Sequence, residues 1–259
     1  MELAEYRRMH ALEARHWWFR AKRRMVYALL RAWAPRGGRV LDVGCGTGMT
    51  LLELPSAYRG LGLDPAAAAL ELCRGRGLAR LARGSATELP LAEASVDAVL
   101  ALDIVEHIED DRLALAEIAR VLRPEGVGVI TVPAFPFLWS AHDEALHHKR
   151  RYTRASLERA LVAGGLAVRA GGFGQATIFP AAACVRLGRR WLGGGGNGGS
   201  DVRPAPAWLD AIAYRLIAWE VPFVRRGWLP VGLSLVYVVS RAGGGSRSAA
   251  TGLAPGRSA

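Results

Sequence analysis

Three glycines at alternate positions, Gly44, Gly46 and Gly48, mark the stretch of this chain where residue types and spacing most clearly permit chemistry. They follow a short apolar run, residues 40–43, that is typical of a buried strand, and helical apolar sequence resumes at Met49. Because glycine has no side chain and tolerates positive φ, a ligand can reach the backbone of such a turn. The turn also leaves free N–H groups at a helix start, which favour an anionic group.

Two carboxylates beside this turn narrow the choice of ligand. A dinucleotide-binding turn would read Gly-x-Gly-x-x-Gly, whereas the third glycine here comes one position early. Asp42 stands just before the turn, where its charge would repel a pyrophosphate and attract an ammonium group. Asp64 ends the second apolar run, where a carboxylate can accept both hydroxyls of a ribose. An amino acid joined to a nucleoside meets both demands, and S-adenosylmethionine is such a molecule.

Together with Gly62-Leu63-Asp64, the run from Val40 to Gly48 resembles the cofactor motifs of class I S-adenosylmethionine-dependent methyltransferases. It is similar in particular to the bacterial small-molecule enzymes related to those of ubiquinone biosynthesis. The resemblance implies an α/β, Rossmann-like fold with a seven-stranded, mostly parallel sheet. It implies S-adenosyl-L-methionine as cofactor and S-adenosyl-L-homocysteine as product. The expected cofactor-binding residues are Asp42, Gly44, Cys45, Gly46, Gly48, Asp64, Pro65, Ser85, Ala86, Thr87, Leu102, Asp103 and His107, and an Asp is common in the family where Ser85 stands.

These motifs lie in an α/β domain that is predicted to span residues 35–175. An N-terminal helical cap, residues 1–34, precedes it, and in similar methyltransferases such helices close the active site. The alternative is that this segment only packs on the domain through its aromatic residues. Residues 176–228 are predicted as an amphipathic helical insert with a glycine-rich linker. Residues 229–241 are predicted as the last strand, antiparallel to its neighbour, and residues 242–259 as a disordered tail.

Polar residues follow the strand predicted at residues 96–102. Ligands of an open parallel sheet bind beyond the carboxyl ends of its strands, so we expect Asp103 and His107 near the transferred methyl group. The Glu106-His107 pair resembles the Glu-His of the ubiquinone-type enzymes, and His107 is a candidate general base. A histidine that packs at the helix start or only contacts the cofactor is the alternative. A metal site formed by Asp103, Glu106, His107 and Asp110 is a further alternative, although carboxylates are also common as helix caps.

Residues 133–153 are predicted to choose the methyl acceptor, because they concentrate aromatic, imidazole and guanidinium side chains beyond the next strand. In the resembling bacterial enzymes, a His-Asp pair followed by His and Arg-Arg-Tyr recurs at this place. His142, oriented by Asp143, is a candidate base for an acceptor hydroxyl, so the catalytic candidates are His142, Asp143 and His107. The candidate acceptor-binding residues are Trp139, His142, His147, Arg150, Arg151 and Tyr152.

Two other interpretations of this segment stay open. Arg150 and Arg151 suit a phosphate or carboxylate of the acceptor, but with Tyr152 they would equally suit the anchoring of a lid. A zinc site would draw on the His142-Asp143 pair and on the two histidines that follow it, His147 and His148. Those ligands have no clear tetrahedral spacing, so no metal is expected.

The insert combines tryptophan with arginine on segments too short to span a membrane. Leu209, Ile212, Leu216 and Trp219 line one face of its second helix, and Trp228 follows a pair of arginines. This pattern is typical of contact with an anionic membrane surface. The alternative is that the two helices of the insert pack on each other or on a dimer partner, and the oligomeric state is left open.

The composition is that of a basic protein with enough apolar residues for a packed core. The 259 residues are 51% hydrophobic and carry a formal net charge of +11. The excess of arginine is spread along the chain without an aromatic-basic module, so no nucleic acid is expected as a partner. Three cysteines without metal spacing, no signal-peptide pattern and no apolar run near ~18 residues predict a cytoplasmic protein. A lipid-binding insert would place it peripherally at the inner face of the membrane.

The sequence therefore predicts an S-adenosylmethionine-dependent methyltransferase that acts on a small-molecule or lipid-linked acceptor, with oxygen as the preferred acceptor atom. A nicotinamide-dependent dehydrogenase is the first alternative, and Gly48 and Asp42 disfavour it. A non-catalytic module that binds the cofactor or a protein partner is the second.

Overall fold

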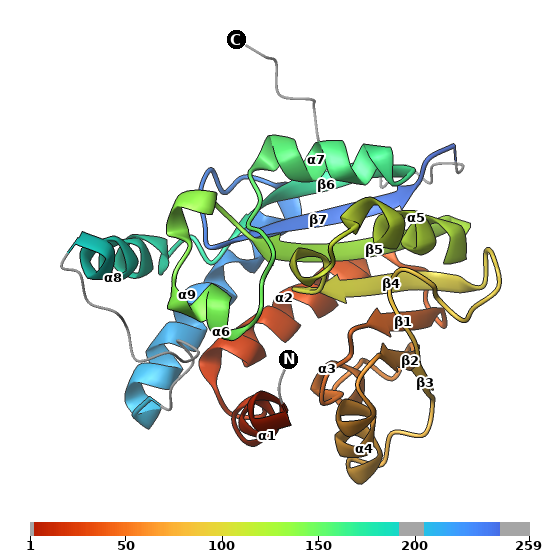
Figure 1. The fold of residues 1–259 in the computed structure, drawn as a ribbon, viewed down its shortest axis with the longest axis horizontal. Coiled ribbons are helices and arrows are strands. Elements are labelled where there is room, and N and C mark those ends of the chain that lie inside the picture. The colour runs from red at the N-terminus through yellow and green to blue at the C-terminus, as the bar shows by residue number, and fades with distance from the viewer. Residues whose placement is uncertain (1–2, 192–204, 244–259) are drawn as a thin grey trace.

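The computed structural model describes residues 3–191 and 205–243, which form one seven-stranded sheet with helices on both faces (Figure 1). The strand order is β3-β2-β1-β4-β5-β7-β6. The first five strands are parallel, and β7 runs antiparallel to both of its neighbours, β5 and β6. The predicted sheet and its antiparallel last strand are thus confirmed. The strands are β1 (Arg39–Val43), β2 (Arg59–Asp64), β3 (Leu81–Arg83), β4 (Val96–Leu102), β5 (Leu122–Pro133), β6 (Leu166–Gly174) and β7 (Ser234–Arg241).

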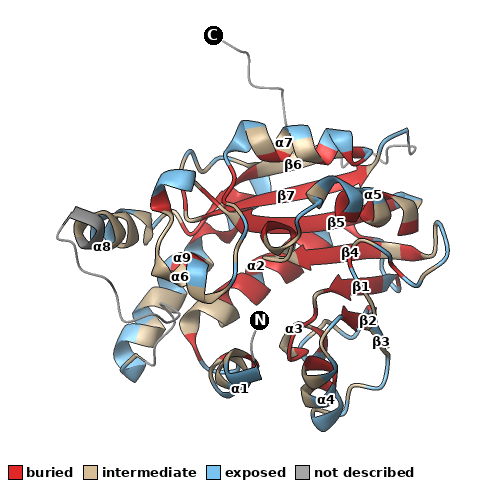
Figure 2. Ribbon diagram, viewed as in Figure 1, coloured by how far each residue is buried: buried red, intermediate tan, exposed pale blue. Residues whose placement is uncertain are grey.

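The sheet separates two apolar clusters, because alternate side chains of each strand point to opposite faces. In β1, Leu41 and Val43 belong to one cluster and Val40 to the other. The first cluster includes residues of α5 (Asp111–Val121) and α7 (Arg154–Ala163), and the second includes residues of α2 (Trp17–Trp33) and α9 (Ala207–Arg226). The central strands are buried on both faces, as parallel strands covered by helices must be (Figure 2).

The remaining helices are short and follow strand ends or loops. They are α1 (Leu3–Leu12), α3 (Met49–Leu52), α4 (Ala67–Gly75), η1 (Val105–His107), η2 (Pro136–Leu138), α6 (Ala141–Ala145) and α8 (Phe179–Trp191). Side-chain caps begin several helices: Asp110 accepts from the Leu113 N–H, and Thr153 accepts from the Ser156 N–H. Pro65 lies two residues before the start of α4.

The N-terminal segment breaks between α1 and α2, at residues 13–16. The ring of His16 accepts a hydrogen bond from the Trp18 N–H and begins the second helix. The chain turns there, so α2 packs on the sheet while α1 lies near α3 and α4 (Figure 1). The two helices of the predicted cap therefore have different positions: one belongs to the core and the other borders the glycine turn.

In the insert, α9 packs along α2 and against β6. Its Asp210 accepts from the Trp17 N–H at 2.7 Å and pairs with Arg20 at 3.3 Å. Its buried Glu220 accepts from the N–H groups of Ala176 and Thr177 at 3.0 and 2.6 Å, which fixes the chain where it leaves β6. The predicted glycine linker, residues 193–200, and most of the predicted tail lie outside the described residues. In the part of the chain that is described, no helix is both long and apolar enough to cross a membrane.

The pairing of β6 with β7 depends on a glycine opposite a tyrosine. Gly171 is the register partner of Tyr237, and a Cβ at that glycine would overlap the tyrosine ring. The ring is held in place, because the Tyr237 hydroxyl donates to Glu158 at 2.6 Å.

Gly171→Ala should therefore lower the free energy of unfolding by about 1–3 kcal/mol through overpacking. Gly75→Ala is the matched control, because a Cβ there meets no atom within 4 Å. It should leave stability unchanged or raise it by about 0.4–1 kcal/mol. Urea unfolding at equilibrium measures both changes, and equal effects of the two substitutions would contradict the packing argument.

Candidate active site

The glycine turn closes tightly on the end of β2. The N–H groups of Gly44 and Cys45 both donate to the carbonyl of Leu63, at 2.8 and 2.9 Å. All three glycines of the turn have positive φ, with values of 69°, 55° and 81°. A Cβ at Gly44 would lie 2.6 Å from Cδ1 of Ile104, so the turn also presses against the segment that follows β4. Glycine is needed here both for the backbone conformation and for the close approach.

The buried carboxylate of Asp64 holds the glycine turn in place through hydrogen bonds. Oδ2 accepts from the Gly46 N–H at 2.9 Å, and Oδ1 accepts from the Ala66 N–H at 2.9 Å. The Tyr6 hydroxyl also lies 3.4 Å from Oδ1. Burial raises the pKa of Asp64, while these hydrogen bonds act in the opposite direction. The carboxylate thus already receives a hydroxyl donor, which is the kind of group that a ribose would bring.

Asp42 is a second buried carboxylate of this region. Burial, together with the nearby carboxylates of Asp64 and Glu13, raises its pKa to about 8. A cationic group bound beside Asp42 would offset the energetic cost of ionising this buried carboxylate and favour its charged form. Together with the open glycine backbone, this arrangement fits the amino-acid end of S-adenosylmethionine, which supplies an ammonium group.

The segment expected to border the adenine begins at the end of β3. The hydroxyls of Ser85 and Thr87 lie 2.7 Å apart, and the Thr87 N–H donates to Ser85 Oγ at 3.2 Å. Ala86 between them is buried, while Ser85 and Pro65 are exposed. Ser85 therefore shapes a turn and keeps a hydroxyl at the surface of this end of the site.

Helix α1 lies directly over the glycine turn. Besides the Tyr6 contact, Met9 lies 2.9 Å from the place where a Gly46 Cβ would stand. Glu13 accepts a hydrogen bond from the Thr47 hydroxyl and pairs at 2.9 Å with Arg76, the residue that follows α4. Trp17 begins α2, so the break after α1 separates it from Tyr6 and Glu13.

The carboxyl end of β4 carries a second charged centre. Asp103 adopts φ +53°, and its N–H donates to the Thr131 carbonyl at 2.9 Å. Its carboxylate accepts from the Thr131 hydroxyl at 3.0 Å and pairs with Lys22 of α2. Burial raises the pKa of Asp103, but Lys22 and Thr131 together outweigh it and lower that pKa. Sequence reasoning missed Lys22, because only the packing of α2 on the sheet brings it there. Leu102, the last residue of β4, is partly buried beside this centre.

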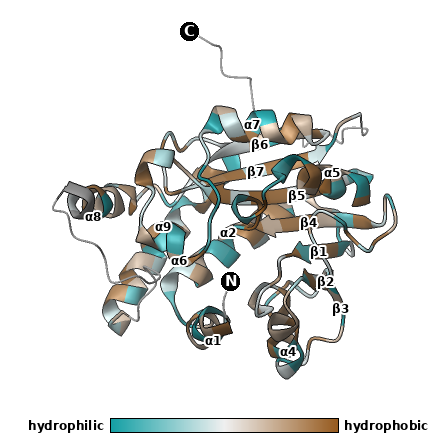
Figure 3. Ribbon diagram, viewed as in Figure 1, coloured by the Kyte–Doolittle hydropathy of each residue, from teal (hydrophilic) through white to brown (hydrophobic). Residues whose placement is uncertain are grey.

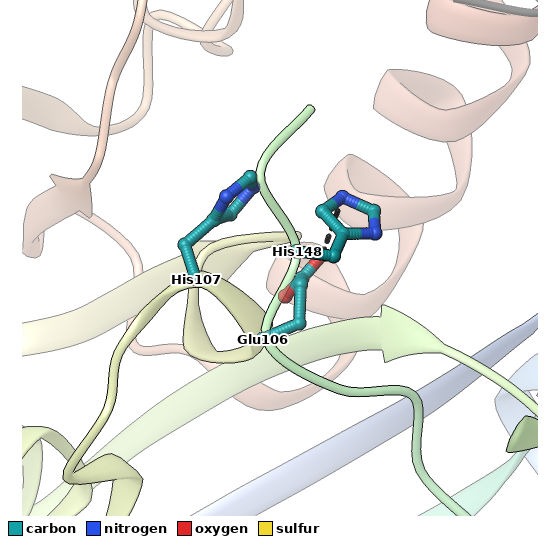
Figure 4. Close-up of side chains that lie close together, drawn as sticks. All are labelled: Glu106, His107 and His148. Carbon is teal, nitrogen blue, oxygen red and sulfur yellow. Dashed lines mark ion pairs between the residues drawn. The ribbon is translucent and has the colours of Figure 1, made fainter. Parts of the chain in front are cut away.

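Glu106, His107 and His148 meet beside this centre, as Figure 4 shows. The two imidazole rings are in edge-to-face contact, with centroids 4.7 Å apart. Burial lowers the pKa of His107 to about 4, so its ring is neutral at physiological pH. Burial raises the pKa of Glu106, and the nearby Asp103 carboxylate raises it further.

Asp143 organises the predicted acceptor segment. Its carboxylate accepts from the Ser140 N–H at 2.9 Å and from Arg151 Nε at 2.7 Å, and it lies 2.9 Å from Nδ1 of His148. These partners outweigh burial and hold the pKa of Asp143 well below its usual range. The sequence predicted that Asp143 orients His142, and the structure shows that its carboxylate contacts the imidazole of His148. The centroid of the His142 ring lies 6.2 Å from the centroid of the His148 ring.

The two arginines and the tyrosine of this segment contact the protein itself. Arg150 donates to the Glu109 carbonyl at 2.8 Å and pairs with Asp111 at 3.3 Å. The buried Tyr152 donates to Asp111 at 2.7 Å. Arg151 is buried, and it donates to the carbonyl of Ala134 in addition to its pair with Asp143. These contacts favour the interpretation that the three side chains anchor the segment. Trp139 and His142 are partly buried and His147 is exposed, so all three have some solvent-accessible surface.

The fold and the glycine-carboxylate site define a Rossmann-like protein that binds a nucleoside joined to an amino acid, and comparisons with known proteins agree. Residues 41–130 match the family model described as "Methyltransferase domain". A Mycolicibacterium smegmatis protein, named as a probable S-adenosylmethionine-dependent methyltransferase, is 33% identical over 65% of this chain and 66% of its own length. The ubiquinone biosynthesis O-methyltransferase of Azorhizobium caulinodans is 35% identical over 37% of this chain and 40% of its own length.

The fold itself is shared with a solved S-adenosylmethionine-dependent methyltransferase of Thermotoga maritima. The TM-score is 0.56 at 18% identity, over 92% of this chain and 94% of that chain. The chain is thus similar to S-adenosylmethionine-dependent methyltransferases, as its cofactor motifs predicted. The matches cover from about two fifths to about two thirds of the length of the two curated relatives named here.

Asp64→Asn should weaken the binding of S-adenosylhomocysteine by about 100-fold, because two hydrogen bonds to a charged acceptor are lost. Titration calorimetry measures the affinity. Asp97→Asn is the matched control, since Asp97 pairs with Arg123 and accepts from the Arg39 N–H at the opposite end of the strands. Wild-type affinity in Asp64→Asn would contradict the assignment of Asp64 to the ribose.

Proposed function

We propose that this protein transfers the methyl group of S-adenosylmethionine to a hydroxyl oxygen of a small-molecule or lipid-linked acceptor. The observation that carries the proposal is the position of the Asp42-glycine-Asp64 site beside a group of imidazoles, at the same edge of the sheet. The first group of residues suits the cofactor, and the second suits an acceptor with a proton to lose. The names of relatives such as the ubiquinone biosynthesis O-methyltransferase support oxygen as the acceptor atom.

The reaction requires little covalent chemistry from the protein. The acceptor oxygen attacks the methyl carbon, the bond from that carbon to sulfur breaks, and its electron pair stays on sulfur as the thioether of S-adenosylhomocysteine. The hydroxyl proton must leave the oxygen. The protein contributes chiefly by aligning sulfur, methyl and oxygen and by excluding water, and α1 over the glycine turn is suited to both tasks.

We assign the acceptance of the proton to His142 rather than to His107. With a pKa of about 4, His107 is a weak base at neutral pH. His142 stands on the outer side of His148, on the partly exposed segment after β5. Trp139 and His147 of the same segment are proposed to contact the acceptor. Asp143 then acts on the site indirectly, by fixing His148 and the turn that carries His142.

A second set of observations supports an amphiphilic acceptor. The predicted apolar face of α9 points outward: Trp208, Leu209, Ile212, Leu216 and Trp219 are exposed, the two tryptophans by 66% and 65%. The opposite face, with Ile217, Val221 and Val224, packs in the core. Apolar and polar residues are mixed along the helix (Figure 3). The packing on α2 thus uses one apolar face and leaves another to water.

Cationic side chains accompany this outward face. Arg215, Arg225 and Arg226 of α9 are exposed, and the Arg226 guanidinium lies 4.9 Å from the ring centre of the exposed Trp228. Tryptophan with arginine at an exposed helix face suits the headgroup region of an anionic bilayer. We therefore propose that α9 rests on the inner face of the cytoplasmic membrane and brings the site to a lipid-linked acceptor.

Wild-type protein, incubated with methyl-labelled S-adenosylmethionine and a fractionated bacterial extract, should transfer label to the organic phase. His142→Ala should lower that transfer by about 10²–10⁴-fold, because the hydroxyl proton has no acceptor, while affinity for S-adenosylhomocysteine stays unchanged. Undiminished transfer by the variant would contradict the base assignment. Cofactor binding without transfer to any fraction would favour a binding module, and binding of NAD in its place would favour a dehydrogenase.

The protein should sediment with vesicles of phosphatidylglycerol and phosphatidylcholine, and less so as salt rises, because exposed charges are screened. Changing both Trp208 and Trp219 to serine should lower the partition coefficient at least about tenfold, through lost apolar burial. Val162→Ser is the matched control, since Val162 is 67% exposed on the distant helix α7. Equal binding by the double variant and the control would overturn the docking proposal.

A further inference from the structure

The buried carboxylate of Glu106 has no hydrogen-bond partner that would explain its position. Its side chain is fully buried, and within the described residues neither of its oxygens has a hydrogen-bond partner. Such a group is costly unless something compensates its charge or receives its hydrogen bonds. The two nearest cations are engaged elsewhere: Lys22 pairs with Asp103, and Arg151 with Asp143 and the Ala134 carbonyl.

Two imidazoles surround this carboxylate. One ligand-type atom from each of Glu106, His107 and His148 can be chosen so that all three lie within 4.8 Å of one another. Nε2 of His148 is 4.0 Å from Oε1 of Glu106, the contact that is dashed in Figure 4. Ligands that share one ion at bonds of about 2.1 Å lie about 3–3.5 Å apart. Small side-chain rotations would therefore close the set around a single ion.

The surroundings of the two rings also suit metal binding. Oδ1 of Asp143 lies 2.9 Å from Nδ1 of His148, while Nε2 of the same ring is the nitrogen on the side of Glu106. A carboxylate beside one ring nitrogen is the usual outer support of a metal-binding histidine. A backbone hydrogen bond to His147 orients the ring of His107.

The backbone joins the two segments that supply the set. Glu106 and His107 lie in η1 after β4, and His148 lies in the segment after β5. The Lys149 N–H donates to the Glu106 carbonyl at 2.8 Å, and the His148 N–H donates to the Asp143 carbonyl at 2.9 Å. The three side chains are thus held together by main-chain contacts that do not depend on an ion.

We propose that Glu106, His107 and His148 bind one divalent transition-metal ion. Two imidazoles and one carboxylate suit Zn²⁺, Mn²⁺, Fe²⁺ or Co²⁺ better than Mg²⁺, which prefers oxygen. Three protein ligands leave coordination positions open, and the site adjoins the segment that carries His142. The ion would hold the acceptor oxygen and lower the pKa of its hydroxyl, whose proton then passes to His142. That role rests on the proposed function, whereas binding of the ion does not.

Co²⁺ titration of chelator-treated protein tests the site, because the visible absorption of Co²⁺ reports ligation by the protein. Wild type should bind one equivalent and become more resistant to heat in its presence. Glu106→Gln and His148→Gln should each bind at least about tenfold more weakly. His147→Asn is the matched control: it removes a neighbouring imidazole, and asparagine tolerates the positive φ of 56° at that position.

Titration with S-adenosylhomocysteine shows whether each variant is folded and separates this proposal from the proposed function. No Co²⁺ binding by a wild-type protein that binds S-adenosylhomocysteine overturns the metal site alone. Equal Co²⁺ affinity in wild type and in a folded Glu106→Gln or His148→Gln variant overturns it too. Stoichiometric binding with methyl transfer that is indifferent to chelation would keep the site and overturn its role toward the acceptor.

Discussion

Buried negative charge at one edge of the sheet is the constraint on which the arrangement of this protein depends. Glu13, Asp42, Asp64, Glu106 and Asp143 are all buried there, and among the described residues the cations near them include the buried Lys22, Arg23 and Arg151 and the partly buried Arg76. A carboxylate away from water must be protonated, hydrogen-bonded or paired. Backbone N–H groups satisfy Asp64, and a cation with a capping turn satisfies Asp143. The oxygens of Glu106 are left without a hydrogen-bond partner among the described residues, and the proposed metal ion would supply a cation there. At Asp42, whose pKa is raised, the ammonium group of the cofactor would have the same effect.

This constraint also explains why carboxylates at the strand ends are in contact with hydrogen-bond donors from other strands and loops. Parallel strands bring their carboxyl ends to one edge, so carboxylates that are distant in sequence become neighbours. The protein separates them with fixed donors, such as the Thr131 hydroxyl toward Asp103 and the Arg151 guanidinium toward Asp143. Each such donor belongs to a different strand or loop. A change in one loop therefore alters the electrostatics of its neighbour, which couples the cofactor half of the site to the acceptor half.

The sequence alone predicts the parts of the site that depend on local residue patterns. The glycine turn, Asp64 at the end of β2 and the bounds of β4 follow from short runs of residues, and the structure has them where they were predicted. The partners of Asp143 could not be found in this way. His142 is its neighbour in sequence, but the turn of α6 directs the carboxylate to His148 and Arg151, five and eight residues further on. Lys22 is a similar case, because its position depends on how α2 packs on the sheet.

Helix α9 illustrates a different limit of prediction from the sequence. Its sequence is apolar on two faces, and periodicity alone does not say which of them is covered. The covered face is the one that also carries Glu220, whose carboxylate receives the N–H groups at the end of β6. Asp210 similarly fixes the start of the helix to α2. The polar residues thus decide the orientation, and the tryptophan face is left outward. Helix α8, which leads from β6 into the insert, contacts the acceptor segment through Arg186 and the Leu138 carbonyl. The insert thus helps to fix the segment that is proposed to hold the acceptor, through α8.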